Sequence, residues 1–144
     1  MENIYFTARR AAGLSQERWA ELLGVSPEAV SQYERDIILP SDRVVLTMAD
    51  LADLQVLGIW HLRKKSEIAA RELPPVERLP LPLAVVQLLD AIRSFSEAHG
   101  EDELLRIAAD GRVDPEEEPR FRAVVRDLDG IVRAAMQIDY AEKG

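Results

Sequence analysis

Residues 13–34, GLSQERWAELLGVSPEAVSQYE, constrain the fold of this chain more than any other segment. Ser15 and Ser26 each precede a helical pattern and suit an N-cap, because a hydroxyl accepts a hydrogen bond from an unpaired backbone N–H of the first turn. Pro27 stands at the first helical position, where its missing N–H costs nothing. Gly24 can end the first helix in the left-handed conformation, since it has no Cβ. The segment predicts two short helices joined by a tight turn.

The apolar side chains of this segment recur three and four residues apart, as on the buried face of a helix. They are Trp19, Leu22 and Leu23 in the first helix and Ala29, Val30 and Tyr33 in the second. Trp19 is expected in the core rather than at a surface. Glu28, Ser31 and Gln32 fall on the outward face of the second helix. Each helix therefore has one face to bury and one polar face to present.

The composition predicts an all-α protein. Hydrophobic residues make up 47% of the 144 residues, and Leu, Ala and Val dominate them, without the alternating runs that indicate strands. No segment approaches 18 uncharged apolar residues, so no membrane span is expected. We find no secretion signal and expect a cytoplasmic protein. The chain has no cysteine, which excludes disulfides and thiolate metal sites.

Four prolines between residues 73 and 82 interrupt the helical patterns and predict a linker. We expect a domain over 1–72 and a second, helical domain over 83–144. In the first domain, helices are predicted at 3–12, 42–54 and 59–72 besides the two capped ones. Ser41 or Asp42 is expected to cap the helix that begins near residue 42.

Two long amphipathic patterns dominate the second domain. The first runs from Leu81 and is expected to end at Gly100, and the second is predicted over 115–141, with Asp114 as its cap and Pro115 at its first position. A short helix is expected at 101–109, followed by a turn at 110–114. The apolar stripes are Leu81, Val85, Leu88, Ile92 and Phe95, and Phe121, Val124, Val125, Leu128, Ile131, Val132, Ala135 and Ile138. Either stripe suits an intramolecular core or an oligomer interface, and we expect dimerisation.

Residues 3–57 resemble the DNA-binding domain of the XRE family, the Cro and phage-repressor class of helix-turn-helix regulators. The shared signature is the Gly-Leu-Ser-Gln start, Ala20 with Gly24, Val30, Glu34, and Pro40 after a short loop. The resemblance implies a five-helix, lambda-repressor-like bundle, followed here by a C-terminal helical dimerisation region. It further implies a transcriptional repressor that binds double-stranded DNA as a homodimer on a palindromic operator, without catalysis, cofactor or metal.

The same resemblance assigns roles to individual positions. Gln16 would contact a backbone phosphate, and Arg43 would contact another at the start of the following helix. The recognition-helix positions that face bases or phosphates are Pro27, Glu28, Ser31, Gln32 and Arg35. Gln32 is the best base reader, because an amide donates to and accepts from adenine at the same time. Arg9 and Glu34 match a pair that forms a structural ion pair.

Two features favour a protein partner instead. The net charge is −8, and residues 73–144 carry 15 acidic against 9 basic side chains, whereas nucleic-acid binding depends on phosphate neutralisation. The loop after the second capped helix reads Asp36-Ile37-Ile38-Leu39, where relatives carry Gly and basic residues. A protein-interaction module or antitoxin that reuses the fold is therefore the alternative hypothesis.

Three further patterns in the sequence suggest binding sites, but each has a structural explanation. Residues 110–117 match the second half of an EF-hand loop, but the first-half ligand positions fall on Arg106 and Ala108, so no calcium site is expected. His61 and His99 have no partner at metal-ligand spacing and are expected at the surface or at helix ends. Arg63–Lys65 suit either a solvated helix face or phosphate contact. No nucleophile, metal or phosphate-loop arrangement predicts an enzyme.

Overall fold

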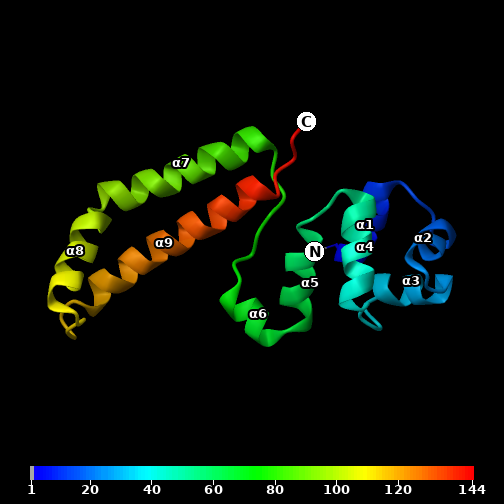
Figure 1. The fold of residues 1–144 in the computed structure, drawn as a ribbon, viewed down its shortest axis with the longest axis horizontal. Helices are drawn as coiled ribbons and strands as arrows, with labels where there is room; N and C mark the ends of the chain where they lie inside the picture. The colour runs from blue at the N-terminus through cyan, green and yellow to red at the C-terminus, as the bar shows by residue number, and fades with distance from the viewer. Residues whose placement is uncertain (1) are drawn as a thin grey trace. The chain divides into compact units, whose positions relative to one another are not determined.

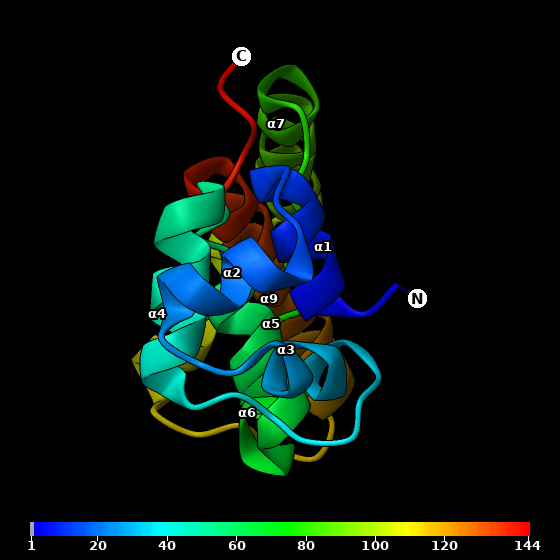
Figure 2. The same cartoon turned by 90° about the vertical axis from the view of Figure 1, so that its right-hand side faces the viewer.

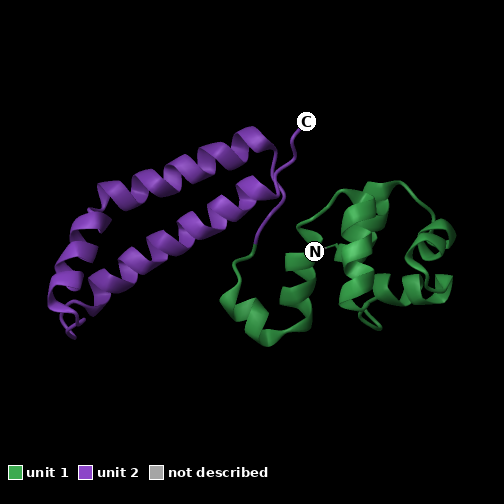
Figure 3. Ribbon diagram, in the orientation of Figure 1, with its two compact units in different colours: residues 1–75 green, residues 76–144 purple. Residues whose placement is uncertain are grey.

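The computed structural model describes residues 2–144 and confirms the all-α fold. Within this range the chain forms nine helices and no strand (Figure 1). It divides into two compact units, residues 1–75 and 76–144 (Figure 3). Among the described helices, none is long and apolar enough to cross a membrane.

Unit 1 contains six helices. They are α1 (Ile4–Ala12), α2 (Gln16–Leu23), α3 (Pro27–Glu34), α4 (Asp42–Ala52), α5 (Leu57–Lys65) and α6 (Glu67–Glu72). Helices α2 and α3 lie at one end of the unit, α1 and α4 lie in the middle, and α5 and α6 lie at the other end (Figure 1). Figure 2 looks at the unit from the α2–α3 end, where both helices face the viewer.

The caps of α2 and α3 are those that the sequence predicts. The Ser15 hydroxyl accepts from the Arg18 N–H at 3.2 Å, and the Ser26 hydroxyl accepts from the Ala29 N–H at 3.0 Å. Gly24 ends α2 with φ of 71°, in the left-handed region. Ser41 caps α4 in the same way. Local sequence therefore fixes where these helices begin and end.

The core of unit 1 joins all of its first five helices. Trp19 is fully buried, as expected for a core residue, whereas Leu22 is 38% exposed and the predicted stripe is wrong at that position. The other buried apolar side chains of these helices are Ile4, Tyr5, Ala8, Ala20, Val30, Tyr33, Val45, Met48, Ala49, Ala52 and Leu57.

Two expectations about residues 59–72 are wrong. The segment is not one helix, because Ser66 takes an extended conformation and its hydroxyl caps α6 by accepting from the Ala69 N–H. His61 does not lie at the surface but is 2% exposed. It follows Leu57 by one helical turn and shares that residue's buried face.

A buried polar chain explains how the interior accommodates His61. The Tyr5 hydroxyl lies 2.7 Å from His61 Nδ1, and His61 Nε2 lies 3.2 Å from an Asp42 carboxylate oxygen. Because a carboxylate only accepts, Nε2 carries the proton and Nδ1 accepts from Tyr5. Burial lowers the pKa of His61 and, with the charge of Asp36, raises the pKa of Tyr5 to about 12. The neutral histidine thus ties α1 and α5 to the start of α4.

Unit 2 contains α7 (Leu81–Glu97), α8 (Gly100–Asp110) and α9 (Glu118–Asp139), with α7 and α9 side by side (Figure 1). The prediction that Gly100 ends the first helix is wrong. His99 takes the left-handed conformation and Gly100 begins α8, where an added Cβ would lie 2.2 Å from the Phe95 ring. The close approach of the Phe95 ring, rather than a helix end, therefore explains why position 100 holds a residue without a Cβ.

The predicted start of the last helix at Pro115 is also wrong. The Asp114 carbonyl accepts from the N–H groups of Glu117 and Glu118, and the Asp114 N–H donates to the Glu117 carboxylate. These bonds close a separate turn, so α9 begins at Glu118. Asp114 therefore belongs to this turn and does not cap the helix.

The buried histidine predicts how stability depends on pH. Its folded pKa lies below the unfolded value of about 6.5, so the unfolded chain binds a proton more readily. The contribution of neutral His61 to the free energy of unfolding of unit 1 should be fully present above a pH of about 6.5 and should decrease as the pH falls below that value. Both tryptophans, Trp19 and Trp60, lie in unit 1, so urea unfolding followed by tryptophan fluorescence at several pH values measures this.

His99 provides a matched control because its side chain is 79% exposed. His61→Gln should flatten the dependence of stability between pH 7.5 and 5.5, and His99→Gln should leave it unchanged. Equal slopes in the wild type and His61→Gln would show that His61 does not carry the effect.

Candidate nucleic-acid interface

The orientation of α3 is fixed by an ion pair with α1. Arg9 Nη2 and Nε lie 2.8 and 2.9 Å from the two Glu34 carboxylate oxygens, and Arg9 Nη1 donates to the Leu14 carbonyl. The side chains are 17% and 7% exposed. The hydrogen bonds to Glu34 raise the pKa of Arg9 further. A bidentate pair of this geometry resists rotation of α3 against α1.

The outward face of α3 carries the side chains that the resemblance assigns to DNA. Pro27 and Glu28 are exposed at its start, and Ser31 and Gln32 are half-buried one turn later. Val30 and Tyr33 are buried on the opposite side. Among the hydrogen bonds formed within residues 2–144, none uses the Gln32 carboxamide. The carboxamide that the sequence predicts to be the base reader is thus not engaged by these residues.

Arg35, at the end of α3, is drawn back onto its own helix. Its Nε donates to the Ser31 hydroxyl at 3.0 Å, and its Nη2 lies 3.6 Å from a Glu28 carboxylate oxygen. Glu28 therefore offsets the charge of the basic residue nearest to it. The structure brings three of the expected site residues together, but as an internal network that must open for phosphate contact.

The two expected phosphate contacts differ in their surroundings. Gln16 begins α2, and its amide lies 3.5 Å from Glu34, beside the Arg9–Glu34 pair. Arg43 is exposed in the first turn of α4. Backbone N–H groups at a helix N-terminus favour a phosphate, so the starts of α2 and α4 offer suitable chemistry.

The loop after α3 is anchored at its first residue. Asp36 has φ of 60° and accepts from the Asn3 amide at 3.0 Å, and it also pairs with Lys64. The Lys64 ammonium, aided by Asn3, holds the pKa of Asp36 below its usual range. Ile37, Ile38 and Leu39 follow and are 55%, 43% and 46% exposed. The loop thus presents three consecutive apolar side chains.

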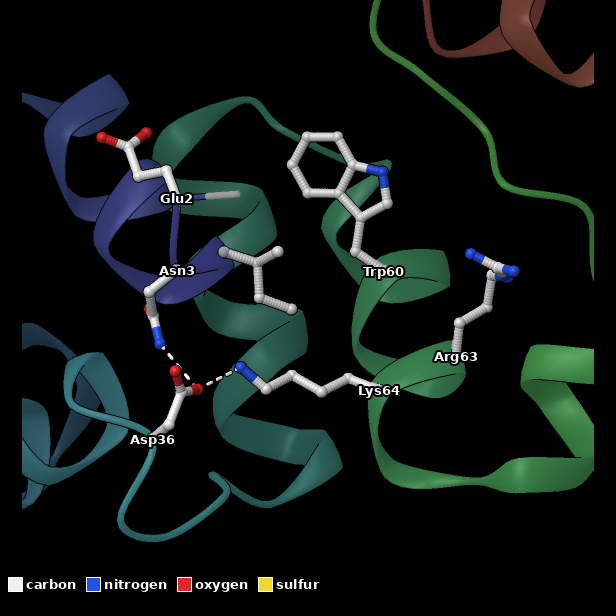
Figure 4. A pocket seen from close by; sticks show the side chains of 7 residues that line it. Glu2, Asn3, Asp36, Trp60, Arg63 and Lys64 are labelled. Atoms are coloured by element: carbon white, nitrogen blue, oxygen red, sulfur yellow. Dashed lines mark hydrogen bonds and ion pairs between the residues drawn. The ribbon is translucent and has the colours of Figure 1, made fainter.

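A cavity of about 330 Å³ lies behind this anchor, with Asn3, Trp60, Arg63 and Lys64 in its lining. In Figure 4, Asn3 and Lys64 converge on Asp36 from two sides. Arg63 donates to the Leu73 and Ala70 carbonyls and so ties α5 to the end of α6. Both basic side chains of the lining are held by contacts within unit 1. The sequence left two interpretations of Arg63 and Lys64 open, a solvated helix face or a phosphate contact, and these contacts support neither.

Sequence reasoning missed the residues that support this face from behind. Asp36, Asp42 and His61 hold the loop and the start of α4, and hydrogen bonds from Lys65 and His61 lower the pKa of Asp42. Their partners lie 19 to 56 residues away, and no short-range spacing shows such pairs. The sequence held a signal for His61 alone: it lies four residues after Leu57, on the same helix face, which could have predicted that it is buried.

In unit 2, the turn before α9 gathers three acidic side chains. Oxygen atoms of Asp110, Asp114 and Glu117 lie within 4.8 Å of one another. Carboxylates at this separation suit a hard cation. The Glu117 carboxylate already accepts from the Asp114 N–H, however, and so has a structural role in closing the turn.

Four helices with side-chain N-caps, packed together with α5 and with a polar outward face on the third, define a helix-turn-helix domain. The family model described as "Helix-turn-helix" matches residues 7–56, from α1 to the residue before α5. This part of the chain is an XRE-family helix-turn-helix domain, the DNA-binding domain of a regulator, as the resemblance implied. Comparison with curated proteins and with solved structures found no match.

The buried ion pair can be tested by removing its acidic partner. Glu34→Ala leaves the Arg9 guanidinium without its counter-charge and should lower the free energy of unfolding of unit 1 by about 3–5 kcal/mol. Urea unfolding followed by tryptophan fluorescence gives the value.

Glu28 lies in the same helix with a 71% exposed side chain and supplies the control. Glu28→Ala should cost less than about 1 kcal/mol, because an exposed pair contributes little. Similar losses in the two variants would mean that the Arg9–Glu34 pair does not hold the domain together.

Proposed function

We propose that this chain is a transcriptional repressor that acts in the cytoplasm and occludes a palindromic operator as a homodimer. The observation that carries the proposal is the α3 face: Ser31 and Gln32 point outward from a helix whose angle is set by the Arg9–Glu34 pair. Helices positioned in this way enter the major groove, where side chains contact base edges.

We propose roles for the individual residues on the same grounds. Gln32 reads adenine through its carboxamide. Pro27, Glu28 and Ser31 shape the start of the reading face, and Gln16, Arg43 and a released Arg35 contact phosphates. Glu28 can accept from cytosine N4 while repelling phosphate. Occlusion of the operator requires no catalytic step.

Charge explains why two copies are needed. The chain carries net charge −8, and Arg35 is partly neutralised by Glu28. Few released counterions mean a shallow dependence of affinity on salt and a weak contribution from each domain. Two half-sites about one DNA turn apart, bound together, supply the missing affinity.

Fluorescence anisotropy with DNA from upstream of the protein's own gene tests specific binding. Titrations at several salt concentrations should give tighter binding than to scrambled DNA of the same composition. Equal affinity for both duplexes would rule out specific regulation by this DNA, and genomic footprinting of the tagged protein would extend the test to the whole genome.

Replacing the proposed base reader should change specificity more than affinity. Gln32→Ala should reduce the preference for operator over scrambled DNA by about 1–3 kcal/mol per half-site and leave non-specific binding almost unchanged. Gln55→Ala, an exposed glutamine after α4, is the control. A uniform loss of affinity across all sequences would assign Gln32 to a phosphate contact instead.

The apolar loop favours a second candidate function, a protein-interaction module. Ile37, Ile38 and Leu39 lie next to α3 and have no obvious use against phosphates. Replacing all three with Ser should abolish capture of a partner protein while leaving the helical content measured by circular dichroism unchanged. Unchanged capture by the triple variant would count against this candidate.

A further inference from the structure

Unit 2 has a small core for its length. Its buried apolar side chains are Val76, Leu79, Ala84, Val124, Ala134 and Ala141, and half of these are alanines. Alanine contributes little burial compared with a Leu or Ile, which stabilises by about 1.5–3 kcal/mol when fully buried. The larger apolar side chains of α7 are therefore mostly exposed, and those of α9 are mostly only half-buried inside the unit.

On α7 the unused side chains form one stripe. Leu81, Val85, Leu89 and Ile92 follow one another at spacings of four, four and three, and all are exposed. Two of them directly follow half-buried residues, Leu88 and Ala91, and Val85 follows the buried Ala84. The stripe is thus rotated by about 100° from the side that packs on α9.

Helix α9 shows the same pattern. Val125 follows the buried Val124, and Val132, which is 53% exposed, follows the half-buried Ile131. Phe121 and Leu128 continue this stripe and are half-buried. Its rotation from the packed side is again about 100° in the same sense.

The two stripes lie on the same side of the α7–α9 hairpin. The helices run antiparallel, since Leu81 at the start of α7 is bonded to Glu142 just after α9. Because the two helices run antiparallel and face each other, the same rotation away from the packed side brings both stripes to the same side of the hairpin. The opposite side of the hairpin supports this placement. There the side chains of Gln87 and Gln137, each one position before a packed residue, are hydrogen-bonded to each other at 3.0 Å.

The hairpin therefore has a polar side and an apolar side. On the polar side, Gln137 also accepts from the Glu77 N–H, so the chain before α7 covers part of it. The apolar side is defined by Leu81, Val85, Leu89, Ile92, Phe121, Val125, Leu128 and Val132, and we name it the apolar face.

We infer that the apolar face is covered by the same face of a second copy of this chain, which completes a four-helix bundle. Two two-helix hairpins packed face to face make such a bundle, and a two-fold axis pairs identical surfaces. The inference rests on the dimer in the proposed function and specifies which surface forms it.

The size of the face suits a dimer. Helix α7 has 17 residues, which gives a length of about 25 Å, and two packed helices are about 20 Å wide with their side chains. Two such faces bury on the order of 1,000 Å², the lower bound for a specific interface.

Charge does not oppose the contact. Between Glu101 and Glu118, eight acidic side chains face two basic ones, so the acidity of unit 2 is concentrated in α8 and the turn after it. Helix α7 has two acidic side chains and one basic, and α9 is similarly balanced. The two surfaces that meet are thus close to neutral.

Sedimentation equilibrium of the full chain tests the inference with a pair of variants on α7. Ile92 and Leu83 are both 45% exposed, but Ile92 lies on the apolar face and Leu83 lies one position before the buried Ala84, toward the polar side. The wild type should be a dimer at micromolar concentration. Ile92→Glu should weaken the dimer by roughly 100-fold or more, because two carboxylates would be buried without partners, and Leu83→Glu should leave it intact.

Three results would overturn the inference: a monomeric wild type, a dimer unaffected by Ile92→Glu, or equal weakening by both variants. Circular dichroism of Ile92→Glu checks that the helices persist. If that variant unfolds, Val85→Gln, a milder change on the same face, should show weaker association and Leu83→Gln should not.

This test is separate from that of the proposed function. A dimer that shows no preference between operator and scrambled DNA would contradict the repressor proposal alone. A monomer that binds operator DNA specifically would contradict this inference alone.

Discussion

The Arg9–Glu34 ion pair is the contact on which the orientation of α3, and with it the proposed DNA-binding face, depends. It joins the first helix to the end of the third through bidentate hydrogen bonds, and both side chains are largely buried. Capping sets where α3 begins, but only a tertiary contact can set the direction in which its polar face points. A buried charge that lost its partner would cost more than the pair itself contributes, so the arrangement has few alternatives.

A second layer of polar contacts supports the same face from behind. Tyr5, His61 and Asp42 link α1, α5 and α4, while Asn3 and Lys64 hold Asp36 at the start of the loop. These contacts hold the starts of α4 and the apolar loop at fixed positions beside α3. These polar contacts thus restrain the helix-turn-helix domain next to the α3 face.

Sequence predicted the parts of the fold that depend on neighbours a few residues away. Ser15, Ser26 and Gly24 act as caps and turn because each needs only its own helix end. The misses concern contacts at long range or competing local signals. His61 is buried by partners from α1 and α4, Ser66 divides a helix whose apolar pattern continues through it, and Gly100 is small because Phe95 lies against it. Of the site, the order of residues on α3 could be predicted, but the withdrawal of Arg35 onto Ser31 and Glu28 could not.

In the proposed function, α3 reads a specific sequence and two copies of the chain do so together. Binding measurements with three duplexes test it most directly: one with the full palindrome, one with a single half-site scrambled, and one with both scrambled. Specific reading by a dimer should give the tightest binding to the palindrome, a large loss of affinity with one half-site scrambled, and only weak binding when both are scrambled. Equal affinity for all three would contradict specific reading, and equal affinity for the palindrome and the single half-site would contradict binding as a dimer.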